Sequence, residues 1–254
     1  MLFCNYSIKQ NISSPYCKGC VHMDTKEKVL QFAKRFDHTL LRPNATFEDF
    51  HVFCRDCWTY HFRMAAINSA PVSYCRSLLE GSGVRVGAAI GFPLGQIPLE
   101  AKVFEAQQAL QQGADDIDYV INITALKAKD YSYIMKEMEQ IVSLCRKNGA
   151  ISKVIFENCY LTAEEIAKMA EIALQIGPDF IKTSTGFGTS GATVQDVRLM
   201  KSVVGNAVKI KAAGGIVHLQ DCFALIDSGA VCLGSSHSVD ILREYKDYLS
   251  RQGS

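Results

Sequence analysis

The fold is constrained most by a regular alternation of short apolar runs with longer segments of helical period. The short runs predict eight strands, at residues 36–41, 64–68, 84–92, 115–123, 152–159, 179–184, 207–212 and 230–234. The longer segments predict helices at residues 26–35, 46–60, 71–80, 98–112, 130–148, 162–177, 194–204, 219–228 and 238–250. From residue 36 onward, each predicted strand is therefore followed by one predicted helix.

This alternation favours a closed barrel of the α/β class. Strands that are apolar on both faces are typical of a parallel sheet covered by helices. Eight such units, with no glycine fingerprint of a dinucleotide-binding sheet, predict a single-domain (β/α)8 TIM barrel over residues 25–254. A doubly wound open sheet is the alternative. The helix at 26–35 is an extra N-terminal element, and residues 1–24, which lack a clear period, are expected to form a loosely ordered extension.

Capping signals mark several helix ends. Thr162 and Glu165 form a T-x-x-E capping box, which predicts that a helix begins there. Gly113 and Gly177 stand where two helical patterns stop, and glycine readily adopts the left-handed conformation that ends helices.

Charge and hydropathy exclude several classes of partner. The net charge is +1, and acids and bases are interspersed, so the chain has no basic stripe for nucleic acid. No apolar run approaches the roughly 18–20 residues needed to cross a bilayer. The N-terminus lacks a basic segment followed by an apolar stretch, so we expect a cytoplasmic protein without a membrane partner.

Ten cysteines are scattered mostly through apolar runs, a pattern that indicates buried free thiols rather than a disulfide scaffold. Two C-x-x-C pairs, Cys17/Cys20 and Cys54/Cys57, leave a zinc site conceivable. The second pair falls in a segment of helical period without turn residues between the thiols. This favours ordinary buried cysteines, and we expect no metal.

Two lysines at strand ends carry the chemical signal. Lys182 and Lys211 end apolar runs and precede glycine-bearing loops, and Asp118 lies in a third strand. Active sites of (β/α)8 barrels lie at the carboxyl ends of the strands, so these side chains are expected to meet. A free lysine, with a pKa of ~10.4, is almost wholly protonated at pH 7, but a second cation and burial lower that pKa. The set therefore predicts Schiff-base chemistry.

Long motifs carry a resemblance to a known family. The matching segments are FDHTLLRPNAT, VGAAIGFPLG, EAKVFEAQQALQQGADDIDYVINITALKAKDY, KVIFENCYLT, DFIKTSTGFGTSGATVQDVRLM, VKIKAAGGI and LGSS. They closely resemble the 2-deoxyribose-5-phosphate aldolase family from about residue 27 to 243. The resemblance implies a class I aldolase that reversibly cleaves 2-deoxy-D-ribose 5-phosphate into D-glyceraldehyde 3-phosphate and acetaldehyde, with no metal or other cofactor.

The resemblance also implies residue roles. Lys182, in K-T-S-T-G, corresponds to the Schiff-base lysine, Lys211 to the second lysine and Asp118 to the acid/base aspartate. Asp37 and Lys153 would support the proton relay, although Asp37 could instead pair with His38 or Arg42. The substrate phosphate would be held by backbone N–H groups in the glycine-rich loops, at Gly186, Gly214, Gly215, Gly234, Ser235 and Ser236.

Some positions depart from the family pattern. Val217 stands where an arginine often helps to hold phosphate, so His218 is a candidate substitute, and His237 follows the serine pair. Lys209 is expected to point inward below Lys211. There it would either lower the pKa of Lys182 further or pair with Glu157 or Asp116.

Two alternative functions stay open: a class I aldolase for a related sugar phosphate, and a catalytically weak barrel that binds sugar phosphates. The expected partners are small sugar phosphates and aldehydes, and a homo-oligomer is compatible with the sequence.

Overall fold

The computed structural model describes residues 24–252. The expected N-terminal extension therefore lies outside the described residues except for Asp24, and so does the Cys17/Cys20 pair. Asp24 caps the first helix, because its carboxylate accepts a hydrogen bond from the N–H of Glu27 at 2.8 Å.

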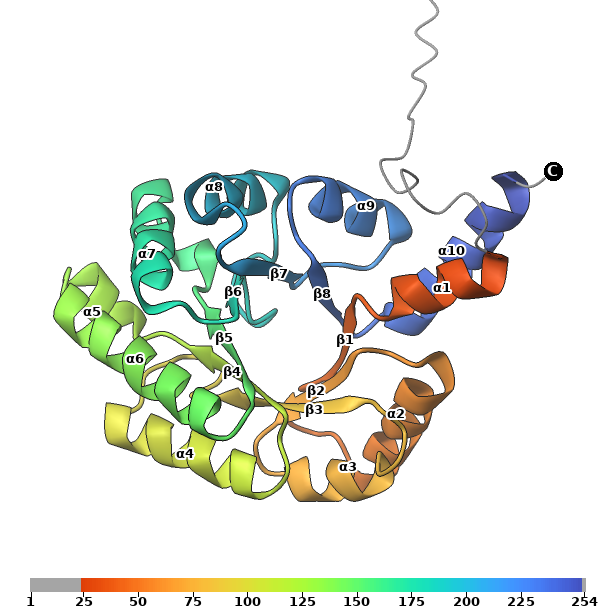
Figure 1. Ribbon diagram of the computed structural model, residues 1–254, viewed down its shortest axis with the longest axis horizontal. Helices are drawn as coiled ribbons and strands as arrows, with labels where there is room; N and C mark the ends of the chain where they lie inside the picture. The colour runs from red at the N-terminus through yellow and green to blue at the C-terminus, as the bar shows by residue number, and fades with distance from the viewer. Residues whose placement is uncertain (1–23, 253–254) are drawn as a thin grey trace, which may run out of the picture.

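The described chain forms a closed barrel of parallel strands in sequence order, with β8 pairing back to β1 (Figure 1). This confirms the predicted (β/α)8 barrel and excludes the open sheet. The strands are β1 (Phe36–Leu40), β2 (Met64–Asn68), β3 (Arg85–Ile90), β4 (Asp116–Val120), β5 (Ile151–Ile155), β6 (Phe180–Lys182), β7 (Lys209–Ala213) and β8 (Cys232–Ser235).

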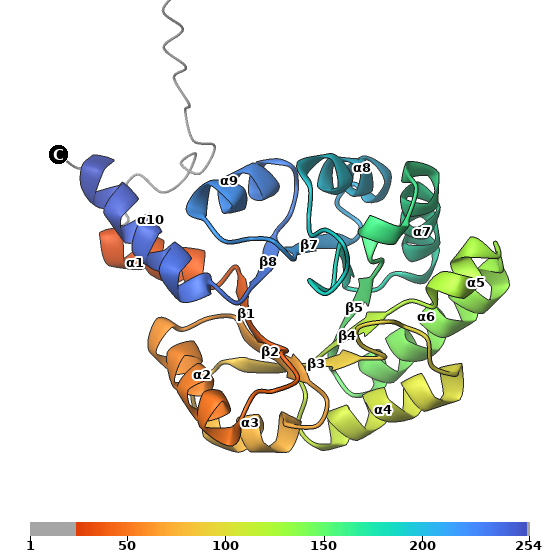
Figure 2. The same ribbon diagram turned by 180° about the vertical axis from the view of Figure 1, so that it is seen from behind.

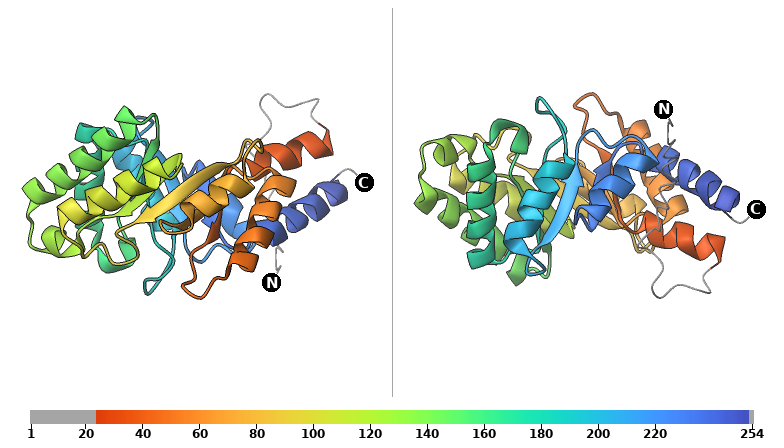
Figure 3. Two further views of the ribbon diagram at one scale, coloured as in Figure 1. Left: turned by 90° about the horizontal axis from the view of Figure 1, so that it is seen from below. Right: turned by 90° about the horizontal axis from the view of Figure 1, so that it is seen from above.

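Helices surround the strands, as Figure 2 shows from behind. They are α1 (Thr25–Ala33), α2 (Phe47–Tyr60), α3 (Val72–Leu78), α4 (Leu99–Gln111), α5 (Ile123–Lys127), α6 (Tyr131–Lys147), α7 (Ala163–Ile176), α8 (Val194–Val204), α9 (Leu219–Asp227) and α10 (Ser238–Gln252). The predicted extra helix, α1, lies beside α10 at one end of the molecule (Figure 3), where the rings of Phe32 and Tyr245 are 4.3 Å apart. No helix within residues 24–252 is long and apolar enough to span a membrane.

Local chemistry explains the helix ends. The predicted capping box is present at Thr162 and Glu165, and Gly177 ends α7 in the left-handed conformation with φ of 72°. The predicted strand over 115–123 is shorter than expected because Asn122 starts the short helix α5. The Asn122 side chain accepts a hydrogen bond from the N–H of Ala125 at 3.0 Å, and this asparagine cap was missed in the sequence.

Apolar side chains fill the space between the strands and the helices, and six of the described cysteines are among the buried residues. They are free thiols, as predicted: Cys54, Cys57, Cys75, Cys145, Cys222 and Cys232. The barrel interior, in contrast, contains buried charges that the register sets side by side. Asp118 is the register partner of Lys153, and Lys182 is the register partner of Lys211.

Candidate active site

The two strand-end lysines and Asp118 meet inside the barrel. The Nζ atoms of Lys182 and Lys211 lie 3.2 and 2.7 Å from the same oxygen of Asp118, Oδ2. All three residues are at least 95% buried. The two amines are therefore near neighbours on adjacent strands, as the Schiff-base hypothesis requires.

The surroundings separate the pKa values of the two lysines. Burial lowers the pKa of Lys182, the charge of Lys211 lowers it further, and the result is about 8 against an ordinary 10.5. Burial acts on Lys211 in the same direction, but Asp118 and Asp37 outweigh it, so the pKa of Lys211 is raised. Lys211 therefore stays cationic at neutral pH, while a useful fraction of Lys182 is the free amine.

Asp37 and Lys153 lie in the same cluster of buried charges. The Nζ of Lys211 is 2.5 Å from Asp37 Oδ2, and the Nζ of Lys153 is 2.6 Å from Asp118 Oδ1. Burial alone would raise the pKa of Asp37, but Lys211, Lys153 and Arg63 lower it to about 2. Asp37 thus pairs with interior cations rather than with its neighbours His38 or Arg42.

The lower layer of the barrel holds a charge cluster that sequence reasoning missed. Asp116 is fully buried and accepts hydrogen bonds from Arg63 at 2.7 Å and from Arg85 at 2.5 Å. Arg63 also donates to Asp37 at 3.0 Å, which links this layer to the upper one. The D-x-D alternation marks Asp116 as inward-facing, but only the closed barrel brings Arg63 to it.

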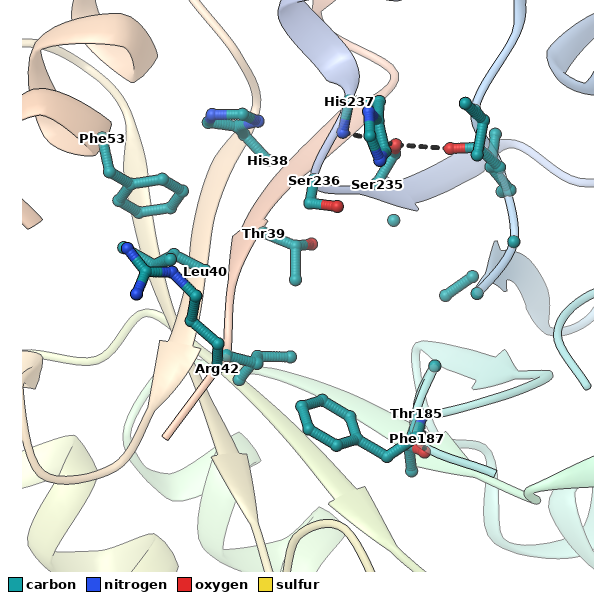
Figure 4. A pocket seen from close by; sticks show the side chains of 18 of the residues that line it. His38, Thr39, Leu40, Arg42, Phe53, Thr185, Phe187, Ser235, Ser236 and His237 are labelled. Atoms are coloured by element: carbon teal, nitrogen blue, oxygen red, sulfur yellow. Dashed lines mark hydrogen bonds between the residues drawn. The ribbon is translucent and has the colours of Figure 1, made fainter. Parts of the chain in front are cut away.

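A cavity of about 730 Å³ opens above these charges. It reaches Lys182 and brings together all the backbone positions predicted for the phosphate: Gly186, Gly214, Gly215, Gly234, Ser235 and Ser236. Figure 4 shows Ser235, Ser236 and His237 on one wall, with Thr185 and Phe187 across the cavity from them. The cavity can therefore admit a phosphorylated sugar whose aldehyde end approaches Lys182.

Two glycine loops approach each other closely on the cavity wall. A side chain at Gly191 would place its Cβ 2.1 Å from the carbonyl oxygen of Gly214, and Gly186 and Gly214 adopt left-handed φ values of 88° and 84°. Among residues 24–252, no protein acceptor contacts the N–H groups of Gly186, Gly214 or Gly215. These donors can bind an anion.

Two expectations about neighbouring cations are wrong. Lys209 is exposed, and its ammonium lies 5.5 Å from the ring centroid of Phe180, so it does not form the expected pair with Glu157 or Asp116. Strand β7 begins at this residue, which is the register partner of Phe180 at the start of β6. His218 is also exposed and is 3.1 Å from Glu244, which makes it a poor substitute for a phosphate-binding arginine.

Cys54 and Cys57 both lie on α2 with their thiols buried. In the part of the chain that the structure describes, no group of three or more His, Cys, Asp or Glu residues could hold a metal ion.

Comparison with known proteins adds independent information. A family model described as DeoC/LacD family aldolase matches residues 32–238. The chain is 53% identical over 215 residues to the deoxyribose-phosphate aldolase of Lactobacillus acidophilus, which covers 85% of this chain and 91% of the relative. It is 51% identical over 219 residues to the deoxyribose-phosphate aldolase of Bacteroides thetaiotaomicron, which covers 86% and 92%.

A solved structure is similar along almost its whole length. It is the deoxyribose phosphate aldolase from Aeropyrum pernix, described as having a unique tetrameric structure. The TM-score is 0.80 at 32% identity, and the match covers 89% of this chain and 93% of the other.

Proposed function

Because the chain belongs to the DeoC/LacD family of aldolases, we propose that it reversibly cleaves 2-deoxy-D-ribose 5-phosphate into D-glyceraldehyde 3-phosphate and acetaldehyde through a Schiff base on Lys182. The observation that carries the proposal is the contact of Lys182 and Lys211 with one oxygen of Asp118 beneath a cavity lined by free backbone donors. The names of the relatives support the substrate.

The reaction begins with a neutral amine. With a pKa of about 8, roughly a tenth of Lys182 is uncharged at pH 7, against about one part in 3,000 at its ordinary value. The amine attacks C1 of the open-chain sugar to give a carbinolamine, and loss of water gives an iminium ion. The iminium accepts the electron pair of the C2–C3 bond as the 3-hydroxyl loses its proton, which releases D-glyceraldehyde 3-phosphate and leaves an enamine.

The remaining steps need proton transfers. The enamine takes up a proton at C2, and water then hydrolyses the new iminium to release acetaldehyde and the free lysine. Asp118 contacts both Lys182 and Lys211, so it can pass protons between the reacting atoms and the second lysine. Asp37 forms an ion pair with Lys211, and Lys153 forms one with the other carboxylate oxygen of Asp118, Oδ1.

We assign the phosphate to the glycine-rich wall. The free N–H groups of Gly186, Gly214 and Gly215 support this assignment, together with Gly234, Ser235 and Ser236, which line the same cavity. His237 also lines this cavity, and its imidazole can donate a hydrogen bond to the phosphate at a site where Val217 replaces an arginine.

Borohydride trapping tests the proposal. Incubation with 2-deoxy-D-ribose 5-phosphate and borohydride should add the reduced adduct mass to one peptide, the one that contains Lys182. Lys182→Met should lose the adduct, whereas the matched variant Lys209→Met, at an exposed lysine of the neighbouring strand, should keep it. A coupled assay should detect glyceraldehyde 3-phosphate. An adduct on another lysine, or release of a different product, would contradict the proposal.

Three broader proposals accompany this function. Residues 25–254 should suffice for activity, which a chain shortened to begin at Met23 would test. A cytoplasmic location is supported by unpaired buried thiols such as Cys54 and Cys75, and cell fractionation would test it. A homo-oligomer is supported by the tetrameric relative and by the exposed Phe47 and Phe104, and light scattering after size-exclusion chromatography would measure its size.

A further inference from the structure

Glu157 is a buried carboxylate that the mechanism above does not use. Its side chain lies just past β5, it is 1% exposed, and its backbone is left-handed with φ of 58°. Within residues 24–252 it has no cationic partner at salt-bridge distance. A buried ion is costly unless its oxygens are well hydrogen-bonded, and a left-handed φ is unfavourable for a residue with a side chain. Such a combination calls for a local reason.

The reason lies in the loop that follows Lys182. Both carboxylate oxygens of Glu157 bind Thr185: one accepts from its N–H at 3.1 Å, and the other accepts from its hydroxyl. The Thr185 hydroxyl oxygen in turn accepts a hydrogen bond from the N–H of Phe187 at 2.9 Å. These bonds hold the residues on both sides of Gly186.

The same carboxylate also supports the next turn of this loop. A side chain at Gly188 would place its Cβ 2.5 Å from the sulfur of Cys159 and 3.4 Å from Glu157 Oε1, so the loop backbone packs directly on both residues. On its other side, Gly186 packs against Gly214 of the second glycine loop. Glu157 therefore supports the loop from beneath, while Gly186 of the same loop lines the cavity with its N–H free.

The backbone that carries Lys182 is held separately. The carbonyl of Lys182 accepts a hydrogen bond from the N–H of Phe156 at 3.0 Å, and its amine contacts Asp118. Neither contact uses the Glu157 side chain. A change of that side chain can thus loosen the Gly186 loop without moving the reacting amine.

We propose that Glu157 is a positioning residue that fixes the segment Thr185–Gly188 as an anion-binding arm and so sets the preference for phosphorylated over unphosphorylated sugars. This inference rests on the proposed function, whose phosphate wall it refines. The negative charge of Glu157 does not meet the anion, because Thr185 lies between them with both of its donors turned to the carboxylate.

The test compares two substrates and one simple anion. Steady-state rates are measured with 2-deoxy-D-ribose 5-phosphate and with 2-deoxy-D-ribose, and inorganic phosphate binding is measured by calorimetry, for the wild type, Glu157→Ala, Glu157→Gln and Glu164→Gln. Glu157→Ala should raise KM for the phosphorylated sugar and Kd for phosphate at least tenfold. Its kcat, and its kcat/KM for 2-deoxy-D-ribose, should stay within about twofold.

The other variants separate positioning from mere stability. Glu157→Gln should restore most of the affinity, because its amide oxygen can accept from the Thr185 N–H and its amide nitrogen can donate to the hydroxyl. Glu164→Gln, at an exposed glutamate of α7, is the matched control and should behave as the wild type. Should Glu157→Ala fail to fold, Thr185→Val, which removes the bridging hydroxyl, should show the same selective loss.

Equal losses with both sugars, or unchanged phosphate binding in a folded Glu157→Ala or Thr185→Val, would overturn the inference. The measurement of phosphate binding separates this inference from the proposed function. A wild type that binds phosphate but forms no Schiff base would refute the aldolase mechanism, and the loss of phosphate binding in Glu157→Ala would still decide the role of Glu157.

Discussion

Removal of the charge of Lys211 is the sharpest test of the site's electrostatics. Lys211→Met takes away a cation that contacts Asp118 Oδ2 at 2.7 Å and leaves that oxygen to Lys182 alone, at 3.2 Å. Both changes favour the ammonium form of Lys182, so its pKa should rise. A full return from about 8 to 10.5 would reduce the neutral fraction at pH 7 by roughly 300-fold. Burial persists in the variant, so this value is the upper limit of the charge effect.

The assay is a pH profile of kcat/KM together with the rate of borohydride trapping, from pH 6 to 11. The wild-type rate should rise through about pH 8 and then level off. In Lys211→Met the rate at pH 7 should fall by roughly 100-fold or more, and it should recover by about tenfold per pH unit toward the shifted pKa. Lys209→Met is the control, because this exposed lysine lies two residues away on the same strand. A variant that is equally slow at every pH, with its midpoint still near 8, would refute the charge argument and assign Lys211 to proton transfer.

Three further outcomes follow from the buried charges. Lys182→Met should raise the free energy of unfolding at pH 7 by roughly 2–3 kcal/mol, as measured by urea denaturation, because the depressed pKa means that the buried ammonium destabilises the fold. Arg63→Met should lower that free energy by about 3 kcal/mol, since Asp37 and Asp116 lose a shared partner; an unchanged urea midpoint would contradict this. The pKa of Asp37, about 2 when folded against 3.8 when unfolded, stabilises the fold above pH 4. About 2 kcal/mol should be lost as the pH falls from 4 to 2, and Asp37→Asn should flatten that part of the pH–stability curve.

The barrel was predictable because its signals are local. Strand and helix patterns, the Thr162 capping box and Gly177 each depend on a few neighbouring residues, and all eight strands lie within the predicted runs or within two residues of them. Short elements that begin at a single side chain were harder to find. The asparagine cap at Asn122 converts the end of one apolar run into α5, although the run continues to look like a strand.

The predicted side chains of the site meet because strand-end positions converge in any closed barrel. Their ion-pair partners could not be predicted, because these depend on the register between the strands. Arg63 precedes β2 and Asp116 begins β4, and nothing local to either residue indicates that they bind each other. Glu157 lies in the run predicted as a strand at 152–159, but β5 ends at Ile155, and the left-handed backbone at Glu157 directs its side chain to Thr185. Lys209 shares a strand with Lys211 but is exposed, because alternation along a strand does not tell how far the buried interior extends.

The balance of charges inside the barrel explains why Lys182 is the group that gives up its proton. Arg63, Lys153 and Lys211 each contact two of the three carboxylates of Asp37, Asp116 and Asp118 at 2.5–3.0 Å, and Arg85 also contacts Asp116. Lys182 contacts one carboxylate, that of Asp118, at the longer distance of 3.2 Å, and it shares that oxygen with Lys211. Loss of a proton from Lys153 or Lys211 would weaken two short ion pairs, whereas loss from Lys182 weakens only its single longer contact. The nucleophile is therefore selected by its weaker ion pairing as well as by its burial.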